Sequence, residues 1–152
     1  MGNHHEMTGR IYSVGYEGFA VESLADRLAQ SGVTVLVDVR LNAVSRKPGF
    51  SKRALEAALR DAGIEYVHER LLGNPADNRD SFRSGDGEAG RARMRSILEN
   101  GGGVALDRLI ERARDAHVAV MCVERDRHRC HRDVVTDMVT EKDRTIEVVQ
   151  VL

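Results

Sequence analysis

The sequence is poor in the residues that bind nucleic-acid bases by stacking. Tryptophan is absent, and aromatic residues make up only 4% of the chain. Proteins that bind single strands usually stack bases on several aromatic rings, so this composition argues against such a platform. The net charge of -1 also gives no overall positive field that would attract nucleic acid or an anionic membrane. Binding to nucleic acid would therefore depend on local clusters of basic residues.

Cysteines and long apolar segments are scarce as well. The chain has two cysteines, and no apolar run approaches the roughly 20 residues that a membrane-spanning helix needs. Two cysteines without a recognisable signal peptide favour a reducing compartment and free thiols. We therefore expect a cytoplasmic protein that makes no contact with a membrane.

The pattern of apolar residues predicts the fold class. Residues 1–10 show no pattern and are expected to be a disordered leader, which leaves residues 11–152 for a single domain. Within this domain, β-branched runs typical of strands alternate with the apolar stripes of helices. The alternation predicts an α/β fold with a mostly parallel central sheet of about five strands and helices on both faces.

The expected elements can be placed along the chain. Strands are expected at about residues 11–15, 33–39, 64–68, 118–123 and 145–152. Helices are expected at about residues 21–30, 52–62, 90–100 and 104–116, and from about residue 130 onward. The polar segment between residues 73 and 87 is expected to be a long loop, which in a small domain is usually a lid, a binding loop or a mobile segment.

Residues 118–132 hold the densest chemistry. The apolar run ends in charged residues after Cys122, and a helical pattern begins near Cys130 and His131. In an open α/β sheet, ligands bind at the carboxyl ends of the strands. Three chemistries fit: a nucleophilic thiol with His131 as acid or base, a metal bound by thiols and histidines, or an anion held by arginines and the helix N-terminus. The fourth interpretation is that both cysteines are buried packing residues.

The metal interpretation has the least support in the sequence. A structural zinc site needs about four ligands. The spacing Cys-x7-Cys-His is not that of a zinc knuckle, and the chain has no second pair of cysteines. We therefore predict no metal and no cofactor.

Polar residues also follow the other predicted strands. Asp38 and Arg40 end the second strand, where they either form an ion pair that fixes the next loop or face the same crevice as Cys122. Further candidates for ligand binding are Gly15 and Tyr16 in a Gly-x-x-Gly turn, Ser45 and Arg46 in a basic loop, and His68 at a strand end. Each has a structural alternative, such as a packed ring for Tyr16 or a solvated loop for Arg46.

Two short motifs suggest an analogy with rhodanese. Cys122 and Arg127 have the Cys-x4-Arg spacing of the rhodanese active loop, and residues 37–40 read Val-Asp-Val-Arg, like an early strand of that fold. In such loops the backbone N–H groups surround a thiolate, and an arginine holds an oxyanion. The glycine that lets the loop curl is missing here, so rhodanese-like thiol chemistry is kept as an alternative.

Several motifs in order resemble domain-of-unknown-function family 488. They are SVGYEG at residues 13–18, VDVR at 37–40, SRKPGFS at 45–51, YVH at 66–68, LGNP at 72–75, and CVE at 122–124 with CHR at 130–132. The resemblance extends from about residue 11 to 139 and departs at Ala43 and Arg127, where many relatives have proline. It implies a small α/β domain but no assigned activity.

The motifs of this resemblance and the strand ends together define the predicted site. The predicted catalytic residues are Cys122, Glu124, Cys130 and His131, and the predicted ligand-binding residues are Gly15, Tyr16, Asp38, Arg40, Ser45, Arg46, His68 and Arg132.

We expect an enzyme that acts on a phosphate-bearing ligand, such as a nucleotide or a nucleic-acid end. Arg40, Arg46 and Arg132 would hold the anion, while Glu124 or His131 would move protons. The alternative is a non-catalytic module for nucleic acid or a ligand, in which a basic helix with Arg91, Arg93 and Arg95 does the binding. The oligomeric state is left open.

Overall fold

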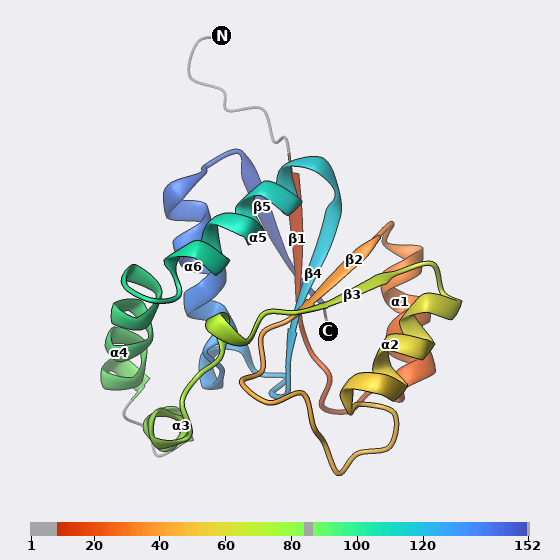
Figure 1. Ribbon diagram of the computed structural model, residues 1–152, viewed down its shortest axis with the longest axis horizontal. Coiled ribbons are helices and arrows are strands. Elements are labelled where there is room, and N and C mark those ends of the chain that lie inside the picture. The colour runs from red at the N-terminus through yellow and green to blue at the C-terminus, as the bar shows by residue number, and fades with distance from the viewer. Residues whose placement is uncertain (1–8, 84–86, 152) are drawn as a thin grey trace, which may run out of the picture.

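The chain folds around one parallel five-stranded sheet. A computed structural model describes residues 9–83 and 87–151. The strands are β1 (Gly9–Gly15), β2 (Val35–Asp38), β3 (Glu65–His68), β4 (His117–Cys122) and β5 (Ile146–Val151). They lie in the order β3-β2-β4-β1-β5 (Figure 1), and every neighbouring pair is parallel. The predicted α/β domain with about five strands is confirmed.

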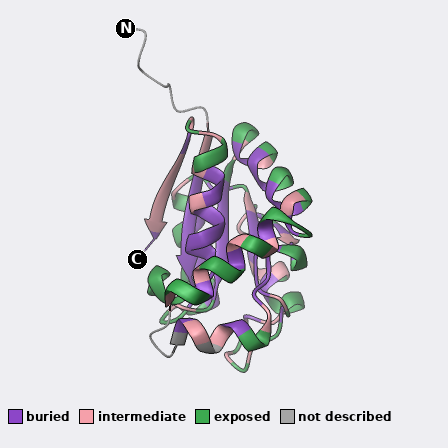
Figure 2. Ribbon diagram, turned by 90° about the vertical axis from the view of Figure 1, so that its left-hand side faces the viewer, coloured by how far each residue is buried: buried purple, intermediate pink, exposed green. Residues whose placement is uncertain are grey.

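Helices cover both faces of the sheet. On one face lie α1 (Val21–Gln30) and α2 (Lys52–Asp61), and on the other lie α5 (Gly103–Asp115) and α6 (Arg132–Lys142), with α4 (Gly87–Glu99) packed against these two. Each face has its own apolar cluster. The central strands β2, β4 and β1 are largely buried between the two layers, whereas the edge strand β5 is mostly half-buried (Figure 2). Burial on both faces explains why β4 is a continuous apolar run in the sequence.

The prediction of a long loop between residues 73 and 87 is wrong in part. The chain forms a 3-10 turn at Arg70–Leu72 and then the helix α3 (Ala76–Arg83), which packs against α4. Asn78 is buried in α3, and its side-chain amide donates hydrogen bonds to Asn74 Oδ1 and to the carbonyl of Gly90. The helix is therefore fixed by tertiary contacts of polar groups, which give no apolar stripe.

The expected leader is also too long. Residues 1–8 lie outside the described part of the chain, but Gly9 and Arg10 belong to β1 and pair with Ile146 and Glu147 of β5. The Nε of Arg10 donates to the carboxylate of Glu147 at 3.1 Å.

Among the described residues, no helix is long and apolar enough to cross a membrane.

The connections diverge where β2 meets β4. The chain leaves β2 toward α2 on one face of the sheet and leaves β4 toward α6 on the other, while the two strands pair directly. In parallel sheets a crevice opens where neighbouring strands send their connections to opposite faces. The fold is therefore expected to form a crevice at the carboxyl ends of β2 and β4.

Candidate functional site

A cavity of about 170 Å³ lies at this crevice. Its walls come from the loop after β2, from α3 with the turn before it, and from the segment between β4 and α6. The predicted site residues that line it are Arg40, Cys122, Glu124, Cys130 and His131. These five predicted residues thus line one cavity, although Arg40 lies more than 80 positions before the other four along the chain.

The other predicted residues do not line this cavity. They are Gly15, Tyr16, Asp38, Ser45, Arg46, His68 and Arg132. Most of them shape the loops around the cavity through hydrogen bonds within the protein, as the following contacts show.

The two cysteines are joined. Cys122 at the end of β4 and Cys130 just before α6 form a disulfide, so the expectation of two free thiols is wrong for this structure. The loop after β4 turns back on itself and brings the two side chains together. Both are buried, with 1% and 2% of their surface exposed. In this state neither sulfur is a thiolate, and neither can act as the predicted nucleophile.

Arg132 holds the loop after β4 from inside. Its Nε donates to the Ser13 hydroxyl at 2.8 Å, Nη1 contacts the Cys122 sulfur at 3.0 Å, and its other hydrogen bonds reach the carbonyls of Glu124 and Arg125. Burial lowers the pKa of the guanidinium to about 10, which still leaves it charged at neutral pH. All three of its nitrogens are used by the protein, so Arg132 positions the loop rather than offering its donors to a ligand.

The guanidinium of Arg40 also binds groups within the protein. Its guanidinium forms a buried ion pair with Asp38, with Nη2 2.7 Å from Oδ2, and donates through Nη1 to the carbonyl of Phe50. Asp38 also accepts a hydrogen bond of 2.6 Å from the Tyr66 hydroxyl, and burial raises the pKa of that hydroxyl. The sequence left open whether Asp38 and Arg40 pair or bind a ligand, and the structure shows the pair.

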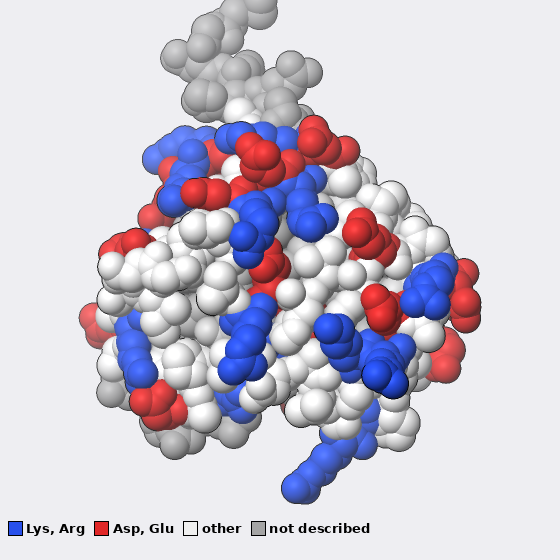
Figure 3. All heavy atoms as spheres, in the orientation of Figure 1, with Lys and Arg blue, Asp and Glu red and all other residues white. Residues whose placement is uncertain are grey.

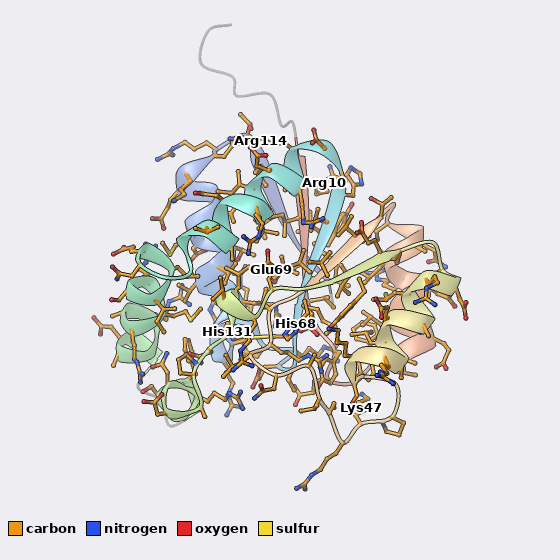
Figure 4. The ribbon with its side chains drawn as sticks, in the orientation of Figure 1. Arg10, Lys47, His68, Glu69, Arg114 and His131 are labelled. Carbon is orange, nitrogen blue, oxygen red and sulfur yellow. A yellow bond between two sulfur atoms is a disulfide. The ribbon has the colours of Figure 1, made fainter. Side chains whose placement is uncertain are left out.

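The two histidines bind the main chain just beyond β2. His68 Nε2 lies 2.7 Å from the carbonyl oxygen of Arg40, and His131 Nε2 lies 2.7 Å from that of Val39 (Figure 4). Because a carbonyl only accepts, each Nε2 carries the proton and donates it. The unprotonated Nδ1 of His131 then lies 3.7 Å from the Cys130 sulfur.

His131 is a neutral imidazole at physiological pH. Burial, the largest cause, and the nearby charges of Arg132 and Arg79 lower its pKa to about 4. A group with this pKa carries no proton to give as an imidazolium near neutrality and is a weak base there. The predicted role of His131 in moving protons therefore has little support from its surroundings.

Tyr16 and Ser45 hold the loop after β2 against the layer of α1 and α2. The Tyr16 hydroxyl donates to Ser45 Oγ at 3.0 Å, and its ring stacks on Phe50 with the centroids 4.3 Å apart. Arg46, in the same loop, is exposed to solvent. Ser45 and Arg46, which were predicted to bind the ligand, therefore lie outside the cavity.

Gly15 has a packing role at the end of β1. A Cβ atom at this position would collide with the carbonyl of Glu124, so only glycine lets the two segments approach this closely. The main chain continues the contact, because Tyr16 N donates to the carbonyl of Cys122 at 3.0 Å. The Gly-x-x-Gly turn thus supports the loop after β4, with the N–H groups of Tyr16 and Glu17 bound to the carbonyls of Cys122 and Val123.

Two arginines that were not among the predicted site residues do face the cavity. Arg79 of α3 is half-buried and Arg129 is exposed, and both line the cavity together with Asn42 and Asn74. Among the side chains that the structure describes, neither guanidinium has a hydrogen-bond or ion-pair partner. Both arginines lie in segments that the sequence marks as polar, but the sequence could not distinguish them from the neighbouring arginines.

The predicted basic helix is neutralised by acidic residues. In α4, Arg91 pairs with Asp133 and Asp137, Arg93 pairs with Asp77, and Arg95 pairs with Glu141. Figure 3 shows basic and acidic side chains interspersed over the face that it presents. The α4 arginines thus do not form the separate positive surface that the nucleic-acid alternative requires.

The rhodanese-like spacing is not matched by a rhodanese-like contact. Arg127 lies near Asp133, with Nε 3.9 Å from the carboxylate, and its side chain is exposed. The guanidinium beside the Cys122 sulfur belongs to Arg132 instead. The loop turns its carbonyl groups toward this guanidinium, whereas an active loop of the rhodanese type surrounds its sulfur with N–H groups.

Comparison with known proteins identifies one family. Residues 20–139 match the model of the family described as domain of unknown function DUF488. Neither the curated proteins nor the solved structures give a match.

Proposed function

Because this chain belongs to the DUF488 family, whose description names no activity, we propose its function from the cavity: an enzyme that acts on a small phosphate-bearing ligand. The ligand class includes nucleotides and nucleic-acid ends. The site is the cavity at the carboxyl ends of β2 and β4.

The pair of cavity arginines carries this proposal. Arg79 and Arg129 come from separate segments, line one cavity, and have no acidic partner among the described residues. A guanidinium offers a fork of N–H donors that matches the oxygens of a phosphate, and two such groups favour a ligand with more than one negative charge. The amide side chain of Asn42 lines the same cavity and adds a further polar contact.

Glu124 is the group that moves a proton in this proposal. Of the four residues that the sequence predicts for catalysis, two are joined in the disulfide and His131 is neutral with a pKa of about 4. Glu124 is half-buried and brings a carboxylate to the cavity wall. It would accept the proton of an attacking water or hydroxyl, while the arginines balance the charge on the phosphoryl oxygens.

Turnover of phosphate-bearing compounds tests the proposal. We expect the oxidised protein to hydrolyse or transfer phosphate from at least one member of a panel of nucleotides and phosphoesters. Glu124→Gln should lower kcat roughly a hundredfold, because it removes the proton acceptor and keeps the shape. The double change Arg79→Gln and Arg129→Gln should mainly raise KM, since it removes the groups that hold the anion.

A matched control comes from the turn that follows α6. Arg144 is exposed and has no hydrogen-bond partner among the described residues, so Arg144→Gln should leave kcat and KM unchanged. The proposal is wrong if no panel member turns over, or if Glu124→Gln keeps the wild-type kcat.

A further inference from the structure

Three potential metal ligands converge at the wall of the cavity. The sulfurs of Cys122 and Cys130 and a carboxylate oxygen of Glu124 all lie within 4.8 Å of one another. All three lie in the short segment that links β4 to α6, and this segment folds back on itself to bring Cys130 beside the other two. Thiolates are soft ligands that favour zinc among the common divalent ions, and a carboxylate is a regular third ligand.

The backbone leaves room for an ion between the sulfurs. The Cα atoms of Cys122 and Cys130 are 7.4 Å apart, whereas most disulfides span roughly 4.4–6.8 Å between Cα atoms. Two thiolates on one zinc ion lie farther from each other than two bonded sulfurs, because each is about 2.3 Å from the metal. The spacing of the main chain therefore suits a bridging ion at least as well as a bond between the sulfurs.

We propose that Cys122, Cys130 and Glu124 bind one zinc ion when the disulfide is reduced. Reduction by two equivalents of a small thiol converts the protein disulfide into two cysteine thiols and leaves the reductant as its own disulfide. Zinc then displaces one proton from each thiol. Three protein ligands leave the fourth position of a tetrahedral ion for water from the cavity.

The surroundings of the cluster suit a metal with anionic ligands. The Arg132 guanidinium lies 3.0 Å from the Cys122 sulfur, and the main-chain N–H of Arg132 points at the Cys130 sulfur at 3.5 Å. Donors of this kind orient ligating sulfurs and stabilise their negative charge. The zinc dication and this guanidinium together carry the positive charge that two thiolates and one carboxylate require.

The inference goes beyond the proposed function, because it concerns the reduced protein. A carboxylate that ligates zinc is not available to accept a proton. The disulfide form and the zinc form are therefore two alternative states of one site, and only the first keeps Glu124 for acid-base chemistry.

Zinc binding is tested on the whole chain without any phosphate compound present. The protein is reduced with tris(2-carboxyethyl)phosphine, freed of reductant under nitrogen, and titrated with zinc against a chromophoric chelator. We expect one tightly bound zinc per chain in the reduced protein and none in the oxidised protein. Cobalt in place of zinc should give a sulfur-to-cobalt charge-transfer band, which reports thiolate ligation directly.

Variants of the three proposed ligands show whether zinc binds at this cluster or elsewhere on the protein. Cys122→Ser, Cys130→Ser and Glu124→Gln should each weaken zinc binding at least tenfold, whereas Glu22→Gln on the exposed side of α1 should not. Equal binding by reduced and oxidised protein, absence of the cobalt band, or wild-type affinity in the double serine variant would overturn the proposal. These readouts do not depend on turnover, so a failure of the proposed enzyme activity would leave them intact.

Discussion

Replacing Arg132 with methionine is expected to lower the free energy of unfolding by roughly 3–5 kcal/mol. The change keeps the bulk of the side chain but removes the donors to Ser13 and to the carbonyls of Glu124 and Arg125. Each buried acceptor that loses its partner costs about 1–3 kcal/mol, and water has little access because only 1% of Arg132 is exposed. Urea unfolding at neutral pH, followed by circular dichroism, measures the loss.

Two further variants show whether the geometry of the guanidinium is responsible. Arg132→Lys keeps the charge but cannot reach all three acceptors from one ammonium, so it should recover only part of the lost stability. Arg144→Met removes an exposed arginine and should change stability by no more than about 0.5 kcal/mol. If the free energy of unfolding of Arg132→Met lies within about 1 kcal/mol of the wild-type value, as it would for a surface substitution, this role of Arg132 is contradicted.

Replacing Asp38 with asparagine should have a comparable effect, about 3–5 kcal/mol. Asp38 is fully buried and accepts from the Arg40 guanidinium, the Arg40 main-chain N–H and the Tyr66 hydroxyl. Asparagine removes the negative charge and leaves the buried guanidinium without its counterion, which costs more than the loss of a neutral hydrogen bond. The same urea unfolding measurement applies.

The control for this pair is its joint replacement. In the double variant Asp38→Leu with Arg40→Met no charge is left unpaired, so it should be more stable than Asp38→Asn alone. Tyr66→Phe removes one hydrogen bond to a charged acceptor and should cost about 1.5–3 kcal/mol. If the double variant is the less stable of the two, the stability at this position does not come from compensating a buried charge.

The sequence predicts the fold well because the signals for it are local. Strands such as β4 are continuous apolar runs, and α1, α2 and α5 have clear apolar stripes, so each element can be recognised without its neighbours. The exception is α3, whose eight residues include a single large apolar side chain, Phe82. Its helical state depends on the buried amide of Asn78 and on packing against α4, neither of which a local pattern reveals.

The site is harder to predict because the use of each side chain depends on what surrounds it. The rule that ligands bind at strand ends indicated the edge of the sheet where the cavity lies, and five of the twelve predicted residues line it. It could not show that the N–H donors of Arg40 and Arg132 bind acceptors within the protein. Nor could it show that Arg79 and Arg129 line the cavity. All four are arginines in polar segments, and only the packed structure distinguishes them. The pairing of Cys122 with Cys130 likewise follows from how the loop after β4 folds back.

The most direct test of the central claim is where a phosphate binds. Inorganic phosphate can be titrated into the ¹⁵N-labelled oxidised protein while the backbone amide shifts are followed by nuclear magnetic resonance. We predict saturable shifts that cluster at residues 40–44, 74–82 and 122–131, the three walls of the cavity, and that disappear in the Arg79→Gln and Arg129→Gln double variant. Shifts that cluster away from these walls, or that persist unchanged in the double variant, would contradict a phosphate site in this cavity.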